Sequence, residues 1–220
     1  NHGLTNPGPL HTLDEGFDVY ATQAFNAPDG TAYEVSWVGL PDTTYPTDDE
    51  NWANCLSQVK KLSIHDGKLI QEPVETIKSL RRNEEKVSGK TIKENTTGQY
   101  ELKLNISANQ TGTLHLAAND DLSESLQIKF DTNDGKLTLD RAQAGQKVAV
   151  DYGTTRSTSF TPHEDLKLDI FVDHSLVEIF VNGGEHVLTG RFFTDPVNQR
   201  IKFYQDTNYQ GNFYNMEPIL

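Results

Sequence analysis

The clearest alternation of apolar and polar positions lies between residues 166 and 193. Its first part places every second residue on one apolar face, made of Leu166, Leu168, Ile170 and Val172. Such a period of two is typical of a half-buried strand. Val177, Ile179 and Val181 repeat the pattern, and Asn182-Gly183 follows as a strong hairpin signal, because both turn positions need a positive φ. We therefore predict consecutive antiparallel strands with these valines and Ile179 buried.

Strand patterns separated by turn sequences continue along the chain and predict an all-β fold. Four strands are expected at residues 18–25, 32–38, 56–64 and 68–71, which is the content of one propeller blade. Pro73 opens a short helix candidate. From about Val87 onward, strands and turns alternate as in a β-sandwich. These patterns predict three segments: a blade over 1–72, a linker with a short helix over 73–86, and an antiparallel β-sandwich over 87–220.

Charge and composition narrow the partners that we expect. The formal net charge of -13 argues against nucleic acid and against anionic membrane surfaces. The single cysteine, Cys55, excludes an internal disulfide and suits a reducing compartment, so a cytoplasmic location is expected. The seven histidines lack metal-ligand spacing and no glycine-rich phosphate loop occurs, so neither a metal nor a cofactor is predicted.

Two segments resemble one known family. Phe-Val-Asp-His-Ser-Leu-Val-Glu-Ile-Phe-Val-Asn-Gly-Gly-Glu, at 171–185, resembles the closing β-sandwich of glycoside hydrolase family 32, the β-fructosidases. Leu-Asp-Glu-Gly-Phe-Asp-Val-Tyr-Ala-Thr-Gln-Ala-Phe, at 13–25, resembles a segment of the last blades of the five-bladed β-propeller of that family. The resemblance implies the C-terminal part of a β-fructofuranosidase that hydrolyses sucrose or sucrose 6-phosphate by a retaining, two-carboxylate mechanism.

The resemblance also implies a substrate-binding set. In the family, the first aspartate of the second motif lines the fructose pocket, and this role falls on Asp14, with Tyr20 and Gln23 as supporting positions. Trp37, within Ser-Trp-Val-Gly, resembles the family tryptophan of Gly-Trp-Met-Gly and is a candidate for stacking on a sugar face. Without the resemblance, the simpler interpretation is that Asp14 caps the turn before Gly16.

The catalytic motifs of the family do not occur in this sequence. The nucleophile motif Trp-Met-Asn-Asp-Pro-Asn-Gly, the Arg-Asp-Pro motif and the acid/base motif Glu-Cys-Pro are all missing. We therefore expect no catalytic residue here and no hydrolysis by this chain alone. Val59-Lys60-Lys61 also departs from the family sequence Pro-Arg-Glu, which puts any salt bridge of that pair in doubt.

Two alternatives stay open. A free-standing carbohydrate-binding sandwich would need an exposed row of aromatic residues, for which the candidates are Tyr204, Tyr209, Phe213 and Tyr214. An independent hydrolase has no motif support. A final blade without its neighbours would also expose apolar surface and self-associate; the residues expected to be exposed are Phe17, Val19, Phe25, Val35 and Trp37.

Overall fold

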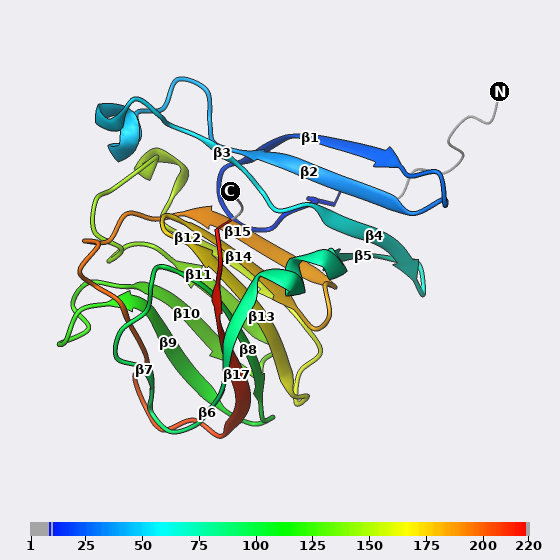
Figure 1. The fold of residues 1–220 in the computed structure, drawn as a ribbon. Coiled ribbons are helices and arrows are strands. Elements are labelled where there is room, and N and C mark those ends of the chain that lie inside the picture. The colour runs from blue at the N-terminus through cyan, green and yellow to red at the C-terminus, as the bar shows by residue number, and fades with distance from the viewer. Residues whose placement is uncertain (1–8, 10, 219–220) are drawn as a thin grey trace.

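The computed structural model describes residues 9 and 11–218, and it is built from antiparallel sheets (Figure 1). The all-β prediction is confirmed. The first sheet, called here the N-terminal sheet, has the order β1-β2-β4-β5 with β3 beside β2. Its strands are β1 (Val19–Asn26), β2 (Ala32–Val38), β3 (Cys55–Leu56), β4 (Lys60–His65) and β5 (Lys68–Pro73).

Two six-stranded sheets follow, called here the two-sheet unit. The near sheet has the order β15-β14-β13-β8-β17-β6, with β6 (Arg81–Val87), β8 (Gln99–Ile106), β13 (Leu166–Asp173), β14 (Leu176–Val181), β15 (His186–Arg191) and β17 (Tyr209–Met216). The far sheet has the order β12-β11-β10-β9-β16-β7, with β7 (Thr91–Lys93), β9 (Thr111–Ala118), β10 (Leu126–Asp131), β11 (Lys136–Asp140), β12 (Thr155–Ser159) and β16 (Arg200–Phe203).

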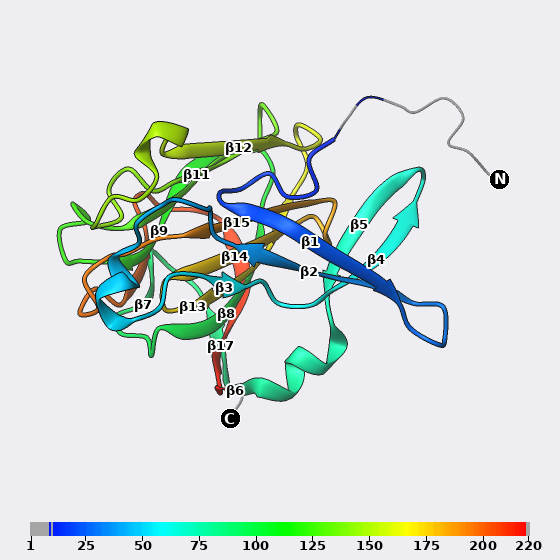
Figure 2. The same ribbon diagram turned by 90° about the horizontal axis from the view of Figure 1, so that it is seen from above.

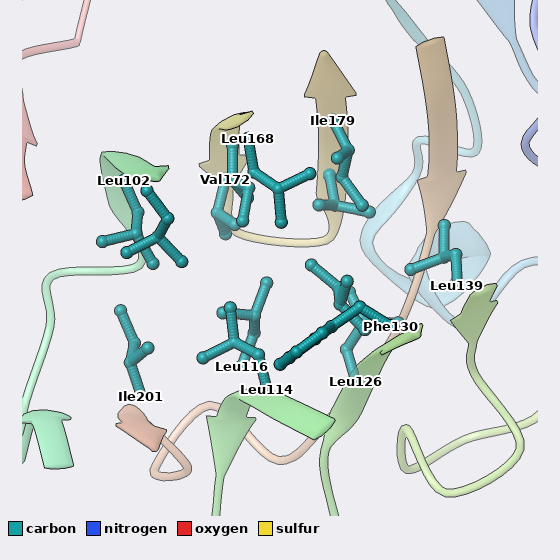
Figure 3. Packing of buried hydrophobic residues seen from close by; sticks show 14 of the residues in the cluster. Leu102, Leu114, Leu116, Leu126, Phe130, Leu139, Leu168, Val172, Ile179 and Ile201 are labelled. Atoms are coloured by element: carbon teal, nitrogen blue, oxygen red, sulfur yellow. The ribbon is translucent and has the colours of Figure 1, made fainter. Parts of the chain in front are cut away.

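The hydrophobic core lies between the near and far sheets. Figure 3 shows Leu168, Val172 and Ile179 of the near sheet facing Leu114 and Phe130 of the far sheet. The predicted burial of the alternating set is confirmed, because Val177, Ile179 and Val181 are fully buried and Val172 is 4% exposed. Their neighbours in sequence point to the opposite face of the near sheet, as the pleat of a strand requires.

The predicted hairpin joins β14 to β15. Asn182 and Gly183 have φ values of 50° and 76°, the conformation that their sequence favours. The next residue, Gly184, touches the N-terminal sheet: its carbonyl accepts a hydrogen bond of 3.0 Å from the Gln71 amide. A Cβ atom at Gly184 would collide with the Gln71 backbone, so this close approach requires glycine.

Short helices occupy the connections. The loop between β2 and β3 contains the 3-10 helix η1 (Pro46–Glu50), and η3 (Val150–Tyr152) precedes β12. The expected helix of the linker is the 3-10 helix η2 (Glu75–Leu80). The first strand after it, β6, begins at Arg81, inside the segment expected as linker. Within residues 9 and 11–218, no helix is long and apolar enough to cross a membrane.

The N-terminal sheet lies across the β14–β15 end of the near sheet, and its hairpin tips extend beyond the two-sheet unit (Figures 1 and 2). Phe25 is 56% exposed, as expected. Val19, Val35 and Trp37 are half-buried. The expectation for Phe17 is wrong: this residue is 1% exposed and belongs to the core of the two-sheet unit.

Candidate functional site

Three of the four predicted site residues share one face of the N-terminal sheet. Tyr20 lies opposite Trp37 in the β1–β2 register, and Gln23 lies opposite Val35. Alternate residues of β2 show that this face points away from the two-sheet unit, because Glu34, Ser36 and Val38 are buried while Tyr33, Val35 and Trp37 are half-buried. The outward face therefore carries an aromatic pair next to an amide.

A β-bulge brings Tyr20 and Gln23 to the same face. Residues three apart in a regular strand point to opposite faces. Between Tyr20 and Gln23 the register shifts, and Ala21 has a φ of 49°. The extra residue of a bulge reorients the following side chains, so Gln23 rejoins the face of Tyr20. The sequence alternation alone does not reveal this bulge.

The aromatic pair is partly open to solvent. The ring centroids of Tyr20 and Trp37 are 5.9 Å apart, with an edge-to-face angle of 66°. Tyr20 is 58% exposed and Trp37 is half-buried. A Cβ atom at Gly39, two residues after Trp37, would overlap the side-chain amide of Asn54 and come close to the Trp37 indole, so these side chains pack directly on the glycine. The Ser-Trp-Val-Gly sequence therefore fixes the indole against the loop before β3.

Asp14 lies at the join with the two-sheet unit. Its Oδ1 accepts hydrogen bonds from the amides of Gly16 at 2.7 Å and of Thr189, in β15, at 3.0 Å. Burial raises the pKa of Asp14, and the bonds from Thr189 and the charge of Lys60 oppose this shift. Its Oδ2 is buried and has no hydrogen-bond partner among the described residues. The structure thus gives Asp14 the turn contact expected from sequence and a second, buried oxygen beside the Thr189 side chain.

The rest of the motif after Asp14 anchors the segment to the near sheet. The amides of Glu15 and Phe17 donate to the carbonyls of Val187 and Thr189, at 2.8 and 2.6 Å, and so cover the edge of β15. A Cβ atom at Gly16 would collide with the Thr189 backbone. The motif at 13–25 therefore has two parts: residues 14–18 anchor the chain, while Tyr20 and Gln23 face outward.

A buried ion pair continues this anchor. Asp18 Oδ2 lies 2.7 Å from Arg141, and the two side chains are only 1% and 4% exposed. The guanidinium of Arg141 also stacks 3.9 Å from the centroid of the Phe17 ring. Sequence reasoning missed this pair, because nothing local to Asp18 or Arg141 indicates that they meet.

Lys60 is the centre of a second buried charge cluster. Its Nζ lies 3.0 Å from Glu34 Oε1, across the β2–β4 pair, and 3.6 Å from Glu178 Oε1 in β14. All three side chains are at most 4% exposed. Lys60 belongs to Val59-Lys60-Lys61, the segment that departs from the family sequence. In this chain Lys60 itself forms ion pairs, with Glu34 and Glu178.

The environment shifts the titration of this cluster. Burial raises the pKa of Glu178 to about 7, although Lys60 and the Gln58 amide oppose the shift. Burial lowers the pKa of Lys60, but Glu178, Glu34 and Asp14 outweigh it and raise that pKa above its ordinary value. The lysine therefore stays charged, and Glu178 is the group that exchanges a proton near neutrality.

Arg191 fixes the loop before β3. This residue is 1% exposed and donates to the Ala53 carbonyl at 2.9 Å and to Ser175 Oγ at 3.0 Å. Its guanidinium also lies 5.1 Å from the ring centroid of Trp52 and 5.5 Å from that of Tyr45. Cation–π contacts of this kind hold a loop without a carboxylate partner.

The aromatic row of the alternative hypothesis does not form. Tyr204 is 65% exposed, but Phe213 is fully buried and Tyr209 and Tyr214 are each 9% exposed. Phe213 belongs to the core, and Arg81 covers the ring of Tyr214 at 4.5 Å. An exposed stacking platform built from these residues is therefore excluded.

Comparison with known families matches both parts of the chain. The model of the glycosyl hydrolases family 32 N-terminal domain matches residues 1–73. The model described as glycosyl hydrolases family 32 C terminal matches residues 68–217. The two matches meet where β5 leads into η2.

Individual relatives agree with these models. A sucrose-6-phosphate hydrolase of Pediococcus pentosaceus is 42% identical over 207 residues, which are 93% of this chain and 41% of that protein. One of Streptococcus mutans is 42% identical over 214 residues, covering 97% and 43%. The solved sucrose-6-phosphate hydrolase of Lactobacillus gasseri superposes with a TM-score of 0.92 at 60% identity, covering 94% of this chain and 43% of that one. The chain thus spans less than half the length of these relatives, and it belongs to family 32 of the glycosyl hydrolases.

Proposed function

We propose that this chain is the C-terminal portion of a cytoplasmic β-fructofuranosidase that hydrolyses sucrose or sucrose 6-phosphate. The N-terminal sheet would be the last blade of a five-bladed propeller over residues 1–72, and the two-sheet unit would be the β-sandwich, with the linker between them. The observation that carries the proposal is the adjoining match to both family models, together with a likeness to a sucrose-6-phosphate hydrolase at 60% identity.

In this proposal the chain binds and orients sugar and does not supply the reacting carboxyl groups. Retaining hydrolysis needs a nucleophile and an acid/base about 5–5.5 Å apart, and the family motifs for both are missing from this sequence. The outward face supplies complementary groups: the Trp37 indole for a sugar face, and the Tyr20 hydroxyl and Gln23 amide for sugar hydroxyls.

Asp14 has a different place in the proposal. Its Oδ1 is committed to Gly16 and Thr189, while Oδ2 remains for one further donor. A fructose hydroxyl would satisfy that buried acceptor, and hydrogen bonds to a carboxylate are among the stronger ones. Asp14 would thereby link the position of the bound sugar to strand β15.

Fragment complementation tests the proposal. The part of the Pediococcus pentosaceus enzyme that precedes the matched region would be produced together with this chain. We expect hydrolysis of sucrose 6-phosphate by the mixture and none by either part alone. Turnover by this chain alone, in a preparation free of contaminating hydrolase, would contradict the proposal.

A matched pair of variants links the activity to the outward face. Tyr20→Ala should lower kcat/KM of the mixture at least about tenfold, because a substrate contact worth about 1.4 kcal/mol is lost. Tyr152→Ala is the control: this tyrosine is 61% exposed, like Tyr20, but lies in the two-sheet unit. Equal effects of the two changes would remove the assigned role of Tyr20.

A further inference from the structure

A second cleft lies far along the chain from the Tyr20–Trp37 face. It has a volume of about 580 Å³ and runs between η2 and the outer face of the near sheet. Strands β8, β13, β14 and β17 supply the sheet wall, and the segment from Glu72 to Arg81 supplies the other wall. This volume falls within the range of about 300–1,000 Å³ that is usual for small-molecule sites.

The floor of the cleft is apolar. Phe171 and Phe180 form an edge-to-face pair with centroids 5.9 Å apart, and Ile77 of η2 packs against them. The alternation of β13 places Phe171 on the face opposite the core, where a side chain would meet solvent. Ile77 of η2 packs on this face and covers Phe171. The linker therefore forms one wall of the cleft in addition to joining the two parts of the chain.

The charges that border the cleft compensate one another. Arg81 binds Glu101 through two hydrogen bonds of 2.5 Å, Lys103 lies 2.5 Å from Asp169, and Lys78 lies 2.7 Å from Glu75. Lys167 and Glu72 complete a balanced set of cations and carboxylates. A cleft with paired charges, in a chain whose net charge is -13, does not attract an anion.

Two buried acceptors lie in the cleft, Asn105 Oδ1 and Asp169 Oδ1. Asn105 Oδ1 has no hydrogen-bond partner among the described residues, whereas Asp169 lies beside Glu101, whose pKa is raised to about 7 by burial and by Asp169. The side chains of Asn105 and Asp169 line the cleft from adjacent strands, since Lys167 pairs with Asn105 and Asp169 pairs with Lys103 in the β13–β8 register. Buried acceptors are normally satisfied, so Asn105 Oδ1 is the atom that points to a ligand with its own donor, and Asp169 beside it keeps that part of the cleft negative.

We propose that this cleft is a second binding site, for a neutral sugar of one to three rings. A sugar hydroxyl would donate to Asn105 Oδ1, and another would accept from Lys167, which also lines the cleft. The C–H face of a sugar ring would lie on the apolar floor of the cleft, at Ile77 and Phe171. A phosphate would meet Asn105 Oδ1 and the carboxylate of Asp169 with its own oxygens and is disfavoured. The inference goes beyond the proposed function, because it concerns a site on the two-sheet unit.

The test is a titration of the isotope-labelled 220-residue chain, followed by amide NMR. The probes are sucrose, 1-kestose and inorganic phosphate. We expect saturable shifts of the Asn105, Lys167 and Gly211 amides with at least one sugar and none with phosphate. These resonances report the cleft itself, so the result is independent of whether the Tyr20–Trp37 face binds substrate.

Two asparagine variants refine the test. Asn105→Ala should raise the Kd for that sugar at least tenfold, whereas Asn95→Ala, at an exposed loop position, should leave it unchanged. Lys167→Ala serves as a second cleft variant if the first does not fold. The proposal is overturned if neither sugar shifts the cleft amides, if phosphate alone shifts them, or if a folded cleft variant binds the sugar as tightly as the parent chain.

Discussion

A cluster of buried charged residues lies at the contact between the N-terminal sheet and the two-sheet unit. Lys60 and Glu34 come from the N-terminal sheet and Glu178 from β14, and all three are nearly inaccessible to solvent. Removing one member of a buried pair typically costs about 3–5 kcal/mol, because the remaining charge is left without compensation. These residues therefore stabilise the contact between the two parts, together with the anchor segment 14–18.

Glu178 should make stability depend on pH. Burial raises its pKa from 4.5 to about 7, so the folded chain binds a proton that the unfolded chain has released. This contribution is fully present below pH 4.5 and is lost as the pH rises toward 7, by up to about 3 kcal/mol. Urea unfolding across this range should show the decline, and Glu178→Gln should reduce it without abolishing it, because burial also raises the pKa of Glu101 to about 7. Glu164→Gln, at an exposed carboxyl group, should leave the decline in place.

Ile179 is the sharpest test of the core assignment. Its side chain is fully buried between the two sheets, so Ile179→Ala should lower the free energy of unfolding by about 2–5 kcal/mol. Ile64→Ala is the matched control, because Ile64 is 66% exposed and its loss should stay within about 0.5 kcal/mol. Denaturant unfolding of both variants checks the difference. A small loss at Ile179 would mean that the face of β14 is assigned backwards.

At the scale of elements, the anchor segment 14–18 connects parts that are distant in sequence. Its backbone extends the edge of β15, Phe17 enters the core, and Asp18 reaches Arg141 beyond β11. An exposed strand edge invites pairing with other chains, so this segment also protects the near sheet. Because β1 begins at Val19, directly after this segment, these contacts also fix the position of the first residue of β1.

The Asp18–Arg141 pair should be worth far more than a surface pair. Asp18→Asn keeps a residue that tolerates the φ of 67° but leaves Arg141 without its counter-charge, so we expect a loss of about 3–5 kcal/mol. Asp120→Asn removes a partner of Arg200 that is 95% exposed, and it should cost less than about 1 kcal/mol. Thermal unfolding compares them; similar losses would mean that the anchor is marginal.

Local patterns predicted the strands better than they predicted the contacts. The burial of Val177, Ile179 and Val181 follows from alternation alone. The burial of Glu178, Thr189 and Arg191 does not, because these side chains point to the outer face and are covered by residues more than a hundred positions away in sequence. Of the site residues, Tyr20 and Trp37 could be paired from motifs, whereas the bulge that returns Gln23 to their face has no sequence signal.

At the scale of the whole molecule, exposed apolar side chains gather on the N-terminal sheet and its loops. Among the described residues, seven large ones are exposed there: Tyr20, Phe25, Trp52, Leu56, Val59, Ile64 and Leu69. The much larger two-sheet unit exposes Val150, Tyr152, Val197 and Tyr204. Concentrated apolar surface of this kind usually meets a partner.

We therefore predict that the chain self-associates through the N-terminal sheet. Light scattering should show a mass that rises with concentration, and the double change Phe25→Ser with Ile64→Ser should reduce it, because both residues are more than half exposed. Val197→Ser, at a position that is 79% exposed in the two-sheet unit, is the control. A monomeric parent chain at high concentration would contradict the prediction.

The cluster of Lys60, Glu34 and Glu178 also limits how these proteins can recombine. The two family models meet at residues 68–73, which invites the view that the halves are interchangeable modules. Yet the cluster draws two members from one side of that boundary and one from the other. A chimera between relatives that differ at any of the three positions would inherit an uncompensated buried charge. In this chain the two parts therefore share one set of buried charges, and a change at Lys60, Glu34 or Glu178 needs a compensating change at its partners.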